Sequence, residues 1–322
     1  MTRAALELAK ETIAVDEAAV TGRFIAFLRD ASERRHPSGP IRRFNQGRDA
    51  GCVEAEFVVR DDLPPEHRVG LFAEPRTYRA FVRFANASSS TDREKDLRGM
   101  SIALSDVDGH NLTPTATRQD FVLNSHPVMV APDTKEFLAL LQAMEGGGLR
   151  RLLYFASHPG AARIGLAARQ QPTCHLDISY WSTTPYLFSP GRAVKYIAKP
   201  CSQRTSRLPE RLTDAYLRDA LRAHLAQDEA CFDFMIQFQL DGREMPIEDA
   251  TVEWKEQRSP YLPVARLRIP RQGIDDAARL RSCEEIAFNP WNCLTDHRPL
   301  GGLNRARKDI YHSLAQLRRD RA

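Results

Sequence analysis

The chain has 322 residues, 42% of them hydrophobic and 27% charged, a composition typical of a soluble protein with a sizeable core. Its formal charge of +4 is small for this length and is concentrated near the C-terminus, between Arg305 and Arg321, which excludes the broad basic surface of a nucleic-acid-binding protein. No run approaches the roughly 18 apolar residues of a membrane-spanning helix, and the N-terminus lacks the pattern of a cleaved leader. We therefore expect a soluble, cytoplasmic protein with no membrane span.

The cysteines are scattered through the chain. They form no Cys-x-x-Cys pair, so a zinc site is not expected. In a cytoplasmic protein, cysteines in this pattern are expected to be reduced. The six are Cys52, Cys174, Cys201, Cys231, Cys283 and Cys293.

Residues 4 to 30 are predicted to form a helix, because Leu6, Ile13, Val20 and Phe27 recur at heptad spacing. Ser38-Gly39-Pro40 ends this pattern. We expect residues 1–35 to be an N-terminal helical extension that packs on the body or on a partner, and residues 36–322 to be one domain.

Short alternating segments separated by turn residues follow, and they predict strands at 53–59, 80–84, 100–104 and 121–123. A helix is predicted over 133–156, with Asp133 or Thr134 as its cap. Further strands are predicted at 174–181, 193–198, 231–240 and 261–269, a helix at 209–226, and an extended crossing at 283–302 before a C-terminal helix. The fold class is α+β, with an antiparallel barrel or sandwich.

The C-terminal helix carries Arg307, Tyr311 and Arg318 on one face, within roughly 40° of each other at about 100° per residue. A tyrosine between two arginines suits an anion, as an iron-bound phenolate beside a haem propionate would require. The alternative is structural, since a basic last turn also complements the helix dipole.

Other stretches of the sequence favour the haem interpretation over the structural one, because they occur in a fixed order along the chain. They are Arg43-Phe44-Asn45-Gln46-Gly47, Val82-Arg83-Phe84, Asp96-Leu97-Arg98-Gly99-Met100, and Asp120 to Pro127 with Phe137 ten residues beyond it. Together with the C-terminal helix, they make the chain resemble the haem catalase superfamily, and its length resembles the small bacterial catalase-related branch, the catalase-like peroxidases.

The resemblance implies a catalase-like antiparallel barrel enclosing haem b, with N-terminal, mid-chain and C-terminal helices. It implies that arginines hold the haem propionates, which prefer guanidinium donors. By position, these are Arg43, Arg83 and Arg318, with Asn124 as the distal amide, Phe137 over the distal face, Tyr311 as the iron ligand and Arg307 as its partner. Structural alternatives remain open: Arg83 could pair with a strand carboxylate, Asn124 could simply end its strand, and Phe137 could be core.

The chain departs from the family pattern at the distal site. Gln46 stands where catalases carry the distal histidine, and Ala85 where they carry the hydroxyl that supports it. A carboxamide can orient a ligand but has no titratable site near neutral pH, and loss of a general acid–base group costs about 10²–10⁴ in rate. His126 could substitute for that histidine, or it could be a turn histidine before Pro127.

A second departure follows Pro127, where Met129 and Val130 replace the paired phenylalanines of the entry channel and could admit a bulkier substrate. We therefore expect a haem-dependent oxidoreductase with weak catalase activity that acts on a peroxide or organic hydroperoxide with an unknown electron donor. The alternative is a non-catalytic haem-binding or small-ligand-sensing protein. Family resemblance and the N-terminal helix also suggest a homo-oligomer.

Overall fold

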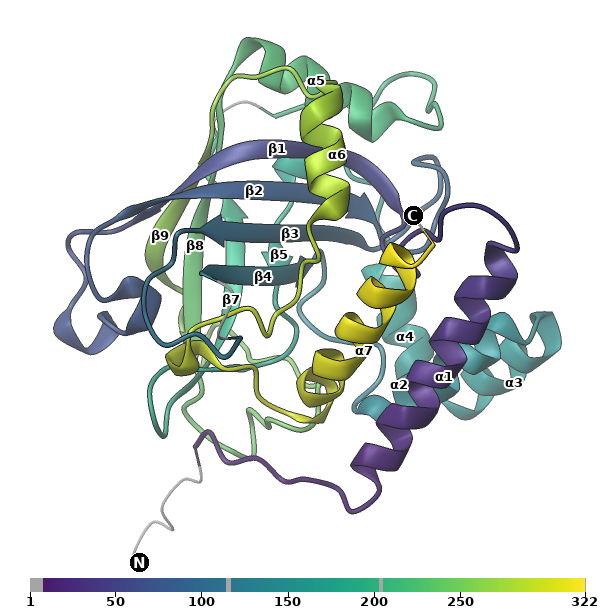
Figure 1. Cartoon of the computed structure of the whole chain (residues 1–322). Coiled ribbons are helices and arrows are strands. Elements are labelled where there is room, and N and C mark those ends of the chain that lie inside the picture. The colour runs from purple at the N-terminus through teal and green to yellow at the C-terminus, as the bar shows by residue number, and fades with distance from the viewer. Residues whose placement is uncertain (1–7, 114–116, 203–204, 322) are drawn as a thin grey trace, which may run out of the picture.

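The computed structural model describes residues 8–113, 117–202 and 205–321. Its central element is an antiparallel sheet in the order β5-β4-β3-β2-β1-β9-β8-β7-β6 (Figure 1). Pairing between β5 and β7 closes the sheet into an eight-stranded barrel within the described residues, with β6 attached to β7. The strands are β1 Arg48–Val59, β2 Thr77–Asn86, β3 Arg98–Ser105, β4 Arg118–Asn124, β5 Tyr180–Trp181, β6 Tyr186–Leu187, β7 Ala193–Pro200, β8 Ala230–Phe238 and β9 Leu262–Ile269. The predicted α+β class with an antiparallel barrel is confirmed.

The interior of the barrel is filled by apolar side chains. Successive residues of a strand point to opposite faces, and one set from each strand, such as Phe57, Val82 and Met100, joins a single buried core. The neighbouring set, including Arg83, therefore lies on the outer face. The predicted site residues that lie on strands belong to this outer set, so a haem held by them would lie against the outside of the barrel.

Seven helices lie outside the barrel within the described residues. They are α1 Glu17–Arg35, α2 Thr134–Glu145, α3 Gly148–Ser157, α4 Pro159–Ala168, α5 Tyr216–Gln227, α6 Ala277–Glu285 and α7 Gly302–Arg319. Helices α5 and α6 contact β1, and the others pack mainly on one another. In Figure 1, α6 crosses over β1 to β3, while α7 runs beside the barrel with α1 against it.

The N-terminal helix begins later than predicted, at Glu17 instead of residue 4. Residues 4 to 7 lie outside the described part, and residues 8 to 16 form no helix. This segment makes its polar contacts elsewhere instead: the Thr12 N–H donates to Glu248 over 2.9 Å, and Glu11 accepts from Arg298 over 2.7 Å and from Arg305 over 2.5 Å. The heptad pattern cannot reveal this, because it takes no account of ion pairs formed with the far end of the chain.

Several mid-chain elements also differ from prediction. The helix predicted over 133–156 is two helices, because the glycines from Gly146 to Gly148 interrupt it; Asp133 caps α2 by accepting the Glu136 N–H over 2.9 Å. Helices α4 and α6 were not predicted, and α5 begins at Tyr216 instead of residue 209. The strand predicted at 174–181 is a single 3₁₀ turn, His175–Asp177, followed by the two-residue β5. Helix α6 also occupies the start of the crossing predicted over 283–302.

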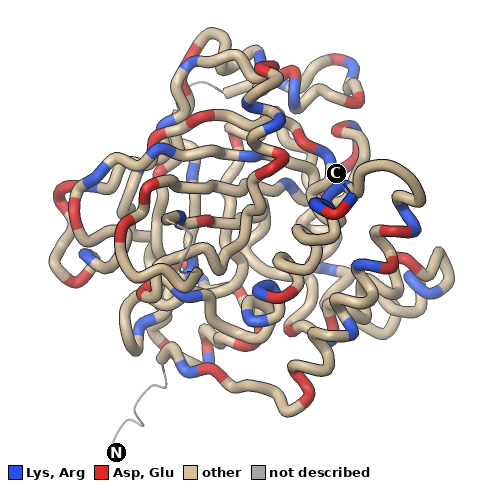
Figure 2. The backbone as a smooth tube through the Cα atoms, viewed as in Figure 1, with Lys and Arg blue, Asp and Glu red and all other residues tan. Residues whose placement is uncertain are grey.

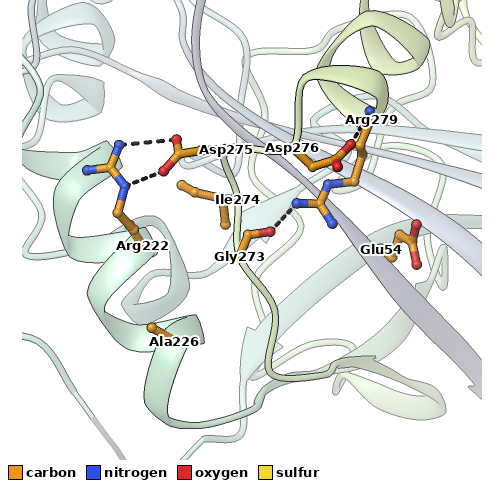
Figure 3. Close-up of a pocket in the computed structure, with 8 residues that line it drawn as sticks. All are labelled: Glu54, Arg222, Ala226, Gly273, Ile274, Asp275, Asp276 and Arg279. Carbon is orange, nitrogen blue, oxygen red and sulfur yellow. Dashed lines mark hydrogen bonds and ion pairs between the residues drawn. The ribbon is translucent and has the colours of Figure 1, made fainter.

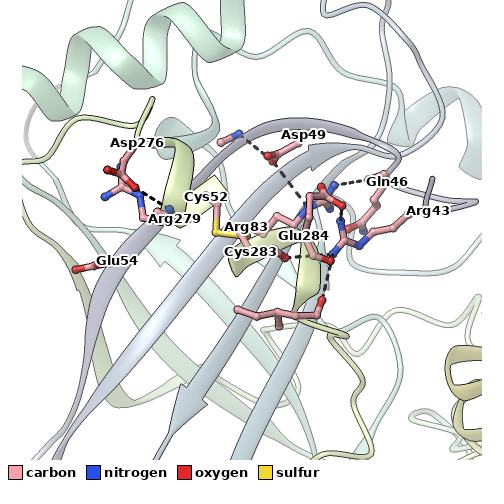
Figure 4. The surroundings of a disulfide bond; sticks show 12 residues. Arg43, Gln46, Asp49, Cys52, Glu54, Arg83, Asp276, Arg279, Cys283 and Glu284 are labelled. Atoms are coloured by element: carbon pink, nitrogen blue, oxygen red, sulfur yellow. Dashed lines mark hydrogen bonds and ion pairs between the residues drawn. A yellow bond between two sulfur atoms is a disulfide. The ribbon is translucent and has the colours of Figure 1, made fainter. Parts of the chain in front are cut away.

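The prediction that the cysteines are reduced is wrong for four of them. A disulfide joins Cys52 on β1 to Cys283 on α6 (Figure 4), and a second joins Cys201 to Cys231. The first closes a loop of 231 residues, a separation that gives no signal in the sequence. Cys174 and Cys293 are free and buried. No helix of the described chain is long and apolar enough to cross a bilayer.

Candidate functional site

The predicted distal residues meet on the outer face of the barrel. The Gln46 Nε2 donates a hydrogen bond to the Asn124 Oδ1 over 3.4 Å. Across the sheet, Asn124 pairs with Gly99, and Gly99 pairs with Ala85. The two amides that the resemblance places at one distal site therefore do lie together, beside the strand position of Ala85.

Gly99 makes room for the Gln46 side chain. A Cβ added at position 99 would fall 2.7 Å from the Gln46 Oε1 and closer still to its Cδ and Nε2. The backbone of Gln46 has a φ of 56° and is fixed by its N–H, which donates to the Ala87 carbonyl over 2.9 Å. The sequence contained a signal for this in the Arg98-Gly99-Met100 motif, but not the reason that the motif needs glycine.

The three predicted propionate arginines form one cationic cluster. Arg83 is 2% exposed, and burial together with the nearby Arg43 lowers its pKa to about 10. Burial and the same neighbour also lower the pKa of Arg318 to about 10. Like charges this close destabilise one another unless an anion separates them, so the cluster is suited to an anionic ligand.

Only part of this charge is neutralised within the described residues. Arg83 donates to the Gln46 carbonyl over 2.7 Å and lies 3.8 Å from Asp49 on β1, while its buried Nε has no hydrogen-bond partner. The Arg318 side chain makes no hydrogen bond or ion pair with any residue that the structure describes. Burial raises the pKa of Asp49, although the charge of Arg83 and a hydrogen bond from the Gly51 N–H act in the opposite direction.

Arg43 is held by the C-terminal end of α6 (Figure 4). Its Nη1 lies 2.6 Å from a Glu284 carboxylate oxygen, and its Nη2 donates to the carbonyls of Cys283, Glu284 and Ile286 over 3.1 to 3.3 Å. The Cys52–Cys283 disulfide fastens this end of α6 to β1. Sequence reasoning missed Glu284, since no motif marks it.

Tyr311 and Phe137 belong to one apolar cluster, which α1, α2 and α7 form together. Both side chains are half-buried, and the Phe137 ring meets the Phe24 ring edge to face, with centroids 5.7 Å apart. Arg307, one turn before Tyr311, donates to Thr184 over 3.1 Å and to Asn304 over 3.0 Å. It is therefore bonded to the barrel side of α7 and not to the phenol.

All three structural alternatives are compatible with these positions, and Arg83 lies 3.8 Å from a strand carboxylate, Asp49 of β1. Asn124 is the last residue of β4, and Phe137 is part of a packed cluster. His126 closes a local turn, since its Nδ1 lies 3.4 Å from the Val128 N–H and 3.2 Å from the Val128 carbonyl. That contact favours the turn interpretation of His126 over a role at the distal site.

A surface hollow of about 680 Å³ lies elsewhere, between α5 and α6, and includes none of the predicted residues (Figure 3). An ion pair crosses it, from the Arg222 Nε to Asp275 over 2.6 Å. The hydrogen bonds to Arg222 and Arg218 lower the pKa of Asp275 to about 2. Two of the charged residues that line this hollow, Arg222 and Asp275, pair with each other, so we assign it no function.

Comparison with known proteins gives a fold and no closer relationship. No family model matches the sequence, and no curated protein matches it. Solved structures with a similar fold include catalase A from Saccharomyces cerevisiae, a fungal catalase and a bacterial catalase, with TM-scores of 0.71, 0.70 and 0.68, each at 16% identity. They match over 90%, 90% and 95% of this chain, which spans only 63%, 62% and 61% of theirs. The chain thus has a catalase-like fold.

Proposed function

We propose that this protein is a haem-dependent oxidoreductase that binds haem b between the outer face of the barrel and α7. The observation that supports this most strongly is the convergence of Arg43, Arg83 and Arg318 from three separate parts of the chain. Two depressed guanidinium pKa values, and a buried Arg83 Nε that makes no hydrogen bond, are consistent with binding of the two carboxylates of a haem.

The chain would hold the cofactor from two sides. The three arginines would bind the propionates, the Tyr311 phenolate would bind the iron, and Phe137 would exclude water from the porphyrin. Haem bound in this way would supply the redox chemistry of its iron. The remaining roles belong to the protein, and they are to position, to exclude water and to donate hydrogen bonds.

The distal side determines which peroxide chemistry is possible. Gln46 and Asn124 can hold a peroxide oxygen by hydrogen bonds, but neither can accept a proton near neutral pH. A missing acid–base group costs about 10²–10⁴ in rate, so we propose weak catalase activity and a peroxide or organic hydroperoxide as the substrate. The electron donor would be a separate reductant.

The first test is the absorption spectrum of the purified protein, which should contain a Soret band. Tyr311→Phe should abolish or greatly weaken haem retention, because only the phenolate oxygen can bond the iron. Tyr154→Phe is the matched control, since Tyr154 is also a half-buried tyrosine on a helix. Wild-type haem content and spectrum in Tyr311→Phe would refute the ligand assignment.

A second candidate function is haem binding or small-ligand sensing without catalysis. It is favoured by the lack of a proton-accepting side chain at position 46 and by the local contact that occupies His126. The two functions differ in one measurement, which is turnover of an organic hydroperoxide in the presence of a reducing co-substrate. Turnover that depends on bound haem supports the enzyme, and its absence in haem-loaded protein supports the sensor.

A further inference from the structure

Helix α3, Gly148–Ser157, turns its apolar face away from the protein. At about 100° per residue, Leu149, Leu152 and Leu153 fall within a stripe roughly 100° wide. They are 71%, 66% and 60% exposed, whereas Tyr154 and Phe155 on the opposite side are half-buried. A surface helix in water normally buries its apolar face, so the orientation of α3 is the reverse of the usual one.

Helix α4, Pro159–Ala168, extends the same surface. Its Leu166 is 74% exposed, and neither α3 nor α4 has a buried residue. Of the large apolar side chains that are exposed in the described chain, five lie between Met144 and Leu166. The two helices pack on each other, and α3 lies at the outer edge of the molecule in Figure 1. Gathered apolar exposure of this kind marks an interaction surface.

The charge of this surface has one sign. Residues 146 to 176 contain no aspartate or glutamate. Four arginines in the interval are exposed, namely Arg150, Arg151, Arg163 and Arg169. Figure 2 shows blue segments on α3 and α4, with the nearest red ones on neighbouring helices.

The nearest acidic side chains on α2 pair with residues other than the four arginines, one of them His158 between α3 and α4. Glu136 lies 3.2 Å from the His158 Nε2, and Glu145 pairs with Arg35 of α1. The α3–α4 surface, defined as the exposed leucines and arginines of residues 148 to 169, is therefore apolar and basic without a local counterion of its own.

We propose that the α3–α4 surface docks on an anionic lipid bilayer. Leucines on an exposed helix face would enter the boundary between headgroups and acyl chains, while the arginines would bind phosphate groups, as in interfacial amphipathic helices. A second copy of this chain fits less well, because a twofold interface apposes the same patch from both copies, and residues 146 to 176 contain no carboxylate that could pair with the arginines. The proposal depends only on this surface and not on haem binding.

The test is co-sedimentation of the full chain with phosphatidylcholine vesicles, with and without phosphatidylglycerol. We expect binding to the anionic vesicles that weakens with added salt. The triple change Leu149→Gln, Leu152→Gln and Leu153→Gln should weaken binding by roughly ten-fold or more. Arg150→Gln with Arg151→Gln should weaken it by about five-fold for each charge removed and reduce its salt dependence.

The control is Leu208→Gln with Leu240→Gln, since both leucines are 48% exposed and lie outside the α3–α4 surface. This variant should bind like the wild type. Failure of the wild type to bind anionic vesicles, or equal loss in the control variant, would overturn the proposal. The proposal would also be overturned if the wild type formed a dimer that did not bind vesicles and that dissociated when the three leucines were replaced. The surface would then be occupied by a second copy of the chain. Circular dichroism checks the fold, and the arginine variant tests the surface if the leucine variant does not fold.

Discussion

The contact between Gln46 and Gly99 makes a sharp prediction about the distal site. Gly99→Ala places a methyl group where the Gln46 amide now lies, 2.7 Å from its Oε1 and closer to two other atoms. The Gln46 backbone cannot yield easily, because its N–H donates to Ala87 and its carbonyl accepts from Arg83 over 2.7 Å. The side chain must therefore rotate away from Asn124.

The magnitude follows from three effects. Loss of the 3.4 Å bond from Gln46 to Asn124, which is long for a hydrogen bond, costs about 0.5 kcal/mol. An off-rotamer side chain costs about 1 kcal/mol, and replacement of glycine by alanine at a φ that alanine tolerates returns about 0.5 kcal/mol through the unfolded chain. Gly99→Ala should thus lower the free energy of unfolding by about 1 kcal/mol.

The effect of Gly99→Ala on the free energy of unfolding should change sign when Gln46 has been replaced by alanine. With no amide to displace, Gly99→Ala keeps only the effect on the unfolded chain and should stabilise by about 0.5 kcal/mol. Urea denaturation of the wild type, both single variants and the double variant measures this coupling. An equal cost of Gly99→Ala in both backgrounds would show that Gln46 does not lie over position 99, and the proposed distal site would lose its geometry.

Three further predictions test other parts of the structure. Gln46→His should raise oxygen evolution from hydrogen peroxide by roughly ten-fold or more, and adding Ala85→Ser should raise it further. Equal and low turnover in the haem-loaded wild type, single variant and double variant would show that position 46 does not face the iron. Burial lowers the pKa of Lys195 to about 7, so between about pH 7 and 10.5 the folded state binds fewer protons than the unfolded state. The free energy of unfolding should therefore rise with pH across that window. In urea titrations at several pH values, Lys195→Met should show a smaller rise. Replacing Cys52 and Cys283 by serine should lower the free energy of unfolding by about 2–5 kcal/mol and weaken haem retention, while unchanged retention would separate α6 from the haem site.

The sequence predicts most of the barrel because its strands are marked by local features. Alternating apolar residues and turn residues placed strands within β1 to β4 and β7 to β9, and register then follows from which face is buried. Strand β5 was misjudged because only two residues pair, so no alternation can develop in Tyr180–Trp181. Helix α6 was missed because it is short and has a single buried residue, Cys283.

The candidate site was predicted in a different way, from ordered motifs compared with a family. That comparison named residues that the structure does bring together, including the pair Gln46 and Asn124 and the arginine cluster. It could not name Glu284, which reaches Arg43 across 241 positions of sequence. The roles of all these residues, the division into residues 1–35 and 36–322, and the cytoplasmic location stay predictions. Disulfides are more common outside the reducing cytosol, so cell fractionation is the direct measurement of location.

The strongest argument that the arginine cluster binds a ligand is the free-energy cost of keeping these charges buried. A pKa lowered from 12.5 to about 10 at Arg83 corresponds to about 3 kcal/mol disfavouring the charged form. Replacing buried charges by apolar side chains of similar size is often neutral or stabilising, so a protein that needed only the scaffold would gain by losing them. Carboxylates neutralise the cluster only in part, because Asp49 lies 3.8 Å from Arg83 and the nearest oxygen of Glu284 is bonded to Arg43. A dianionic ligand that contacts all three guanidinium groups would offset this cost, and perturbed charges gathered in this way are characteristic of functional sites.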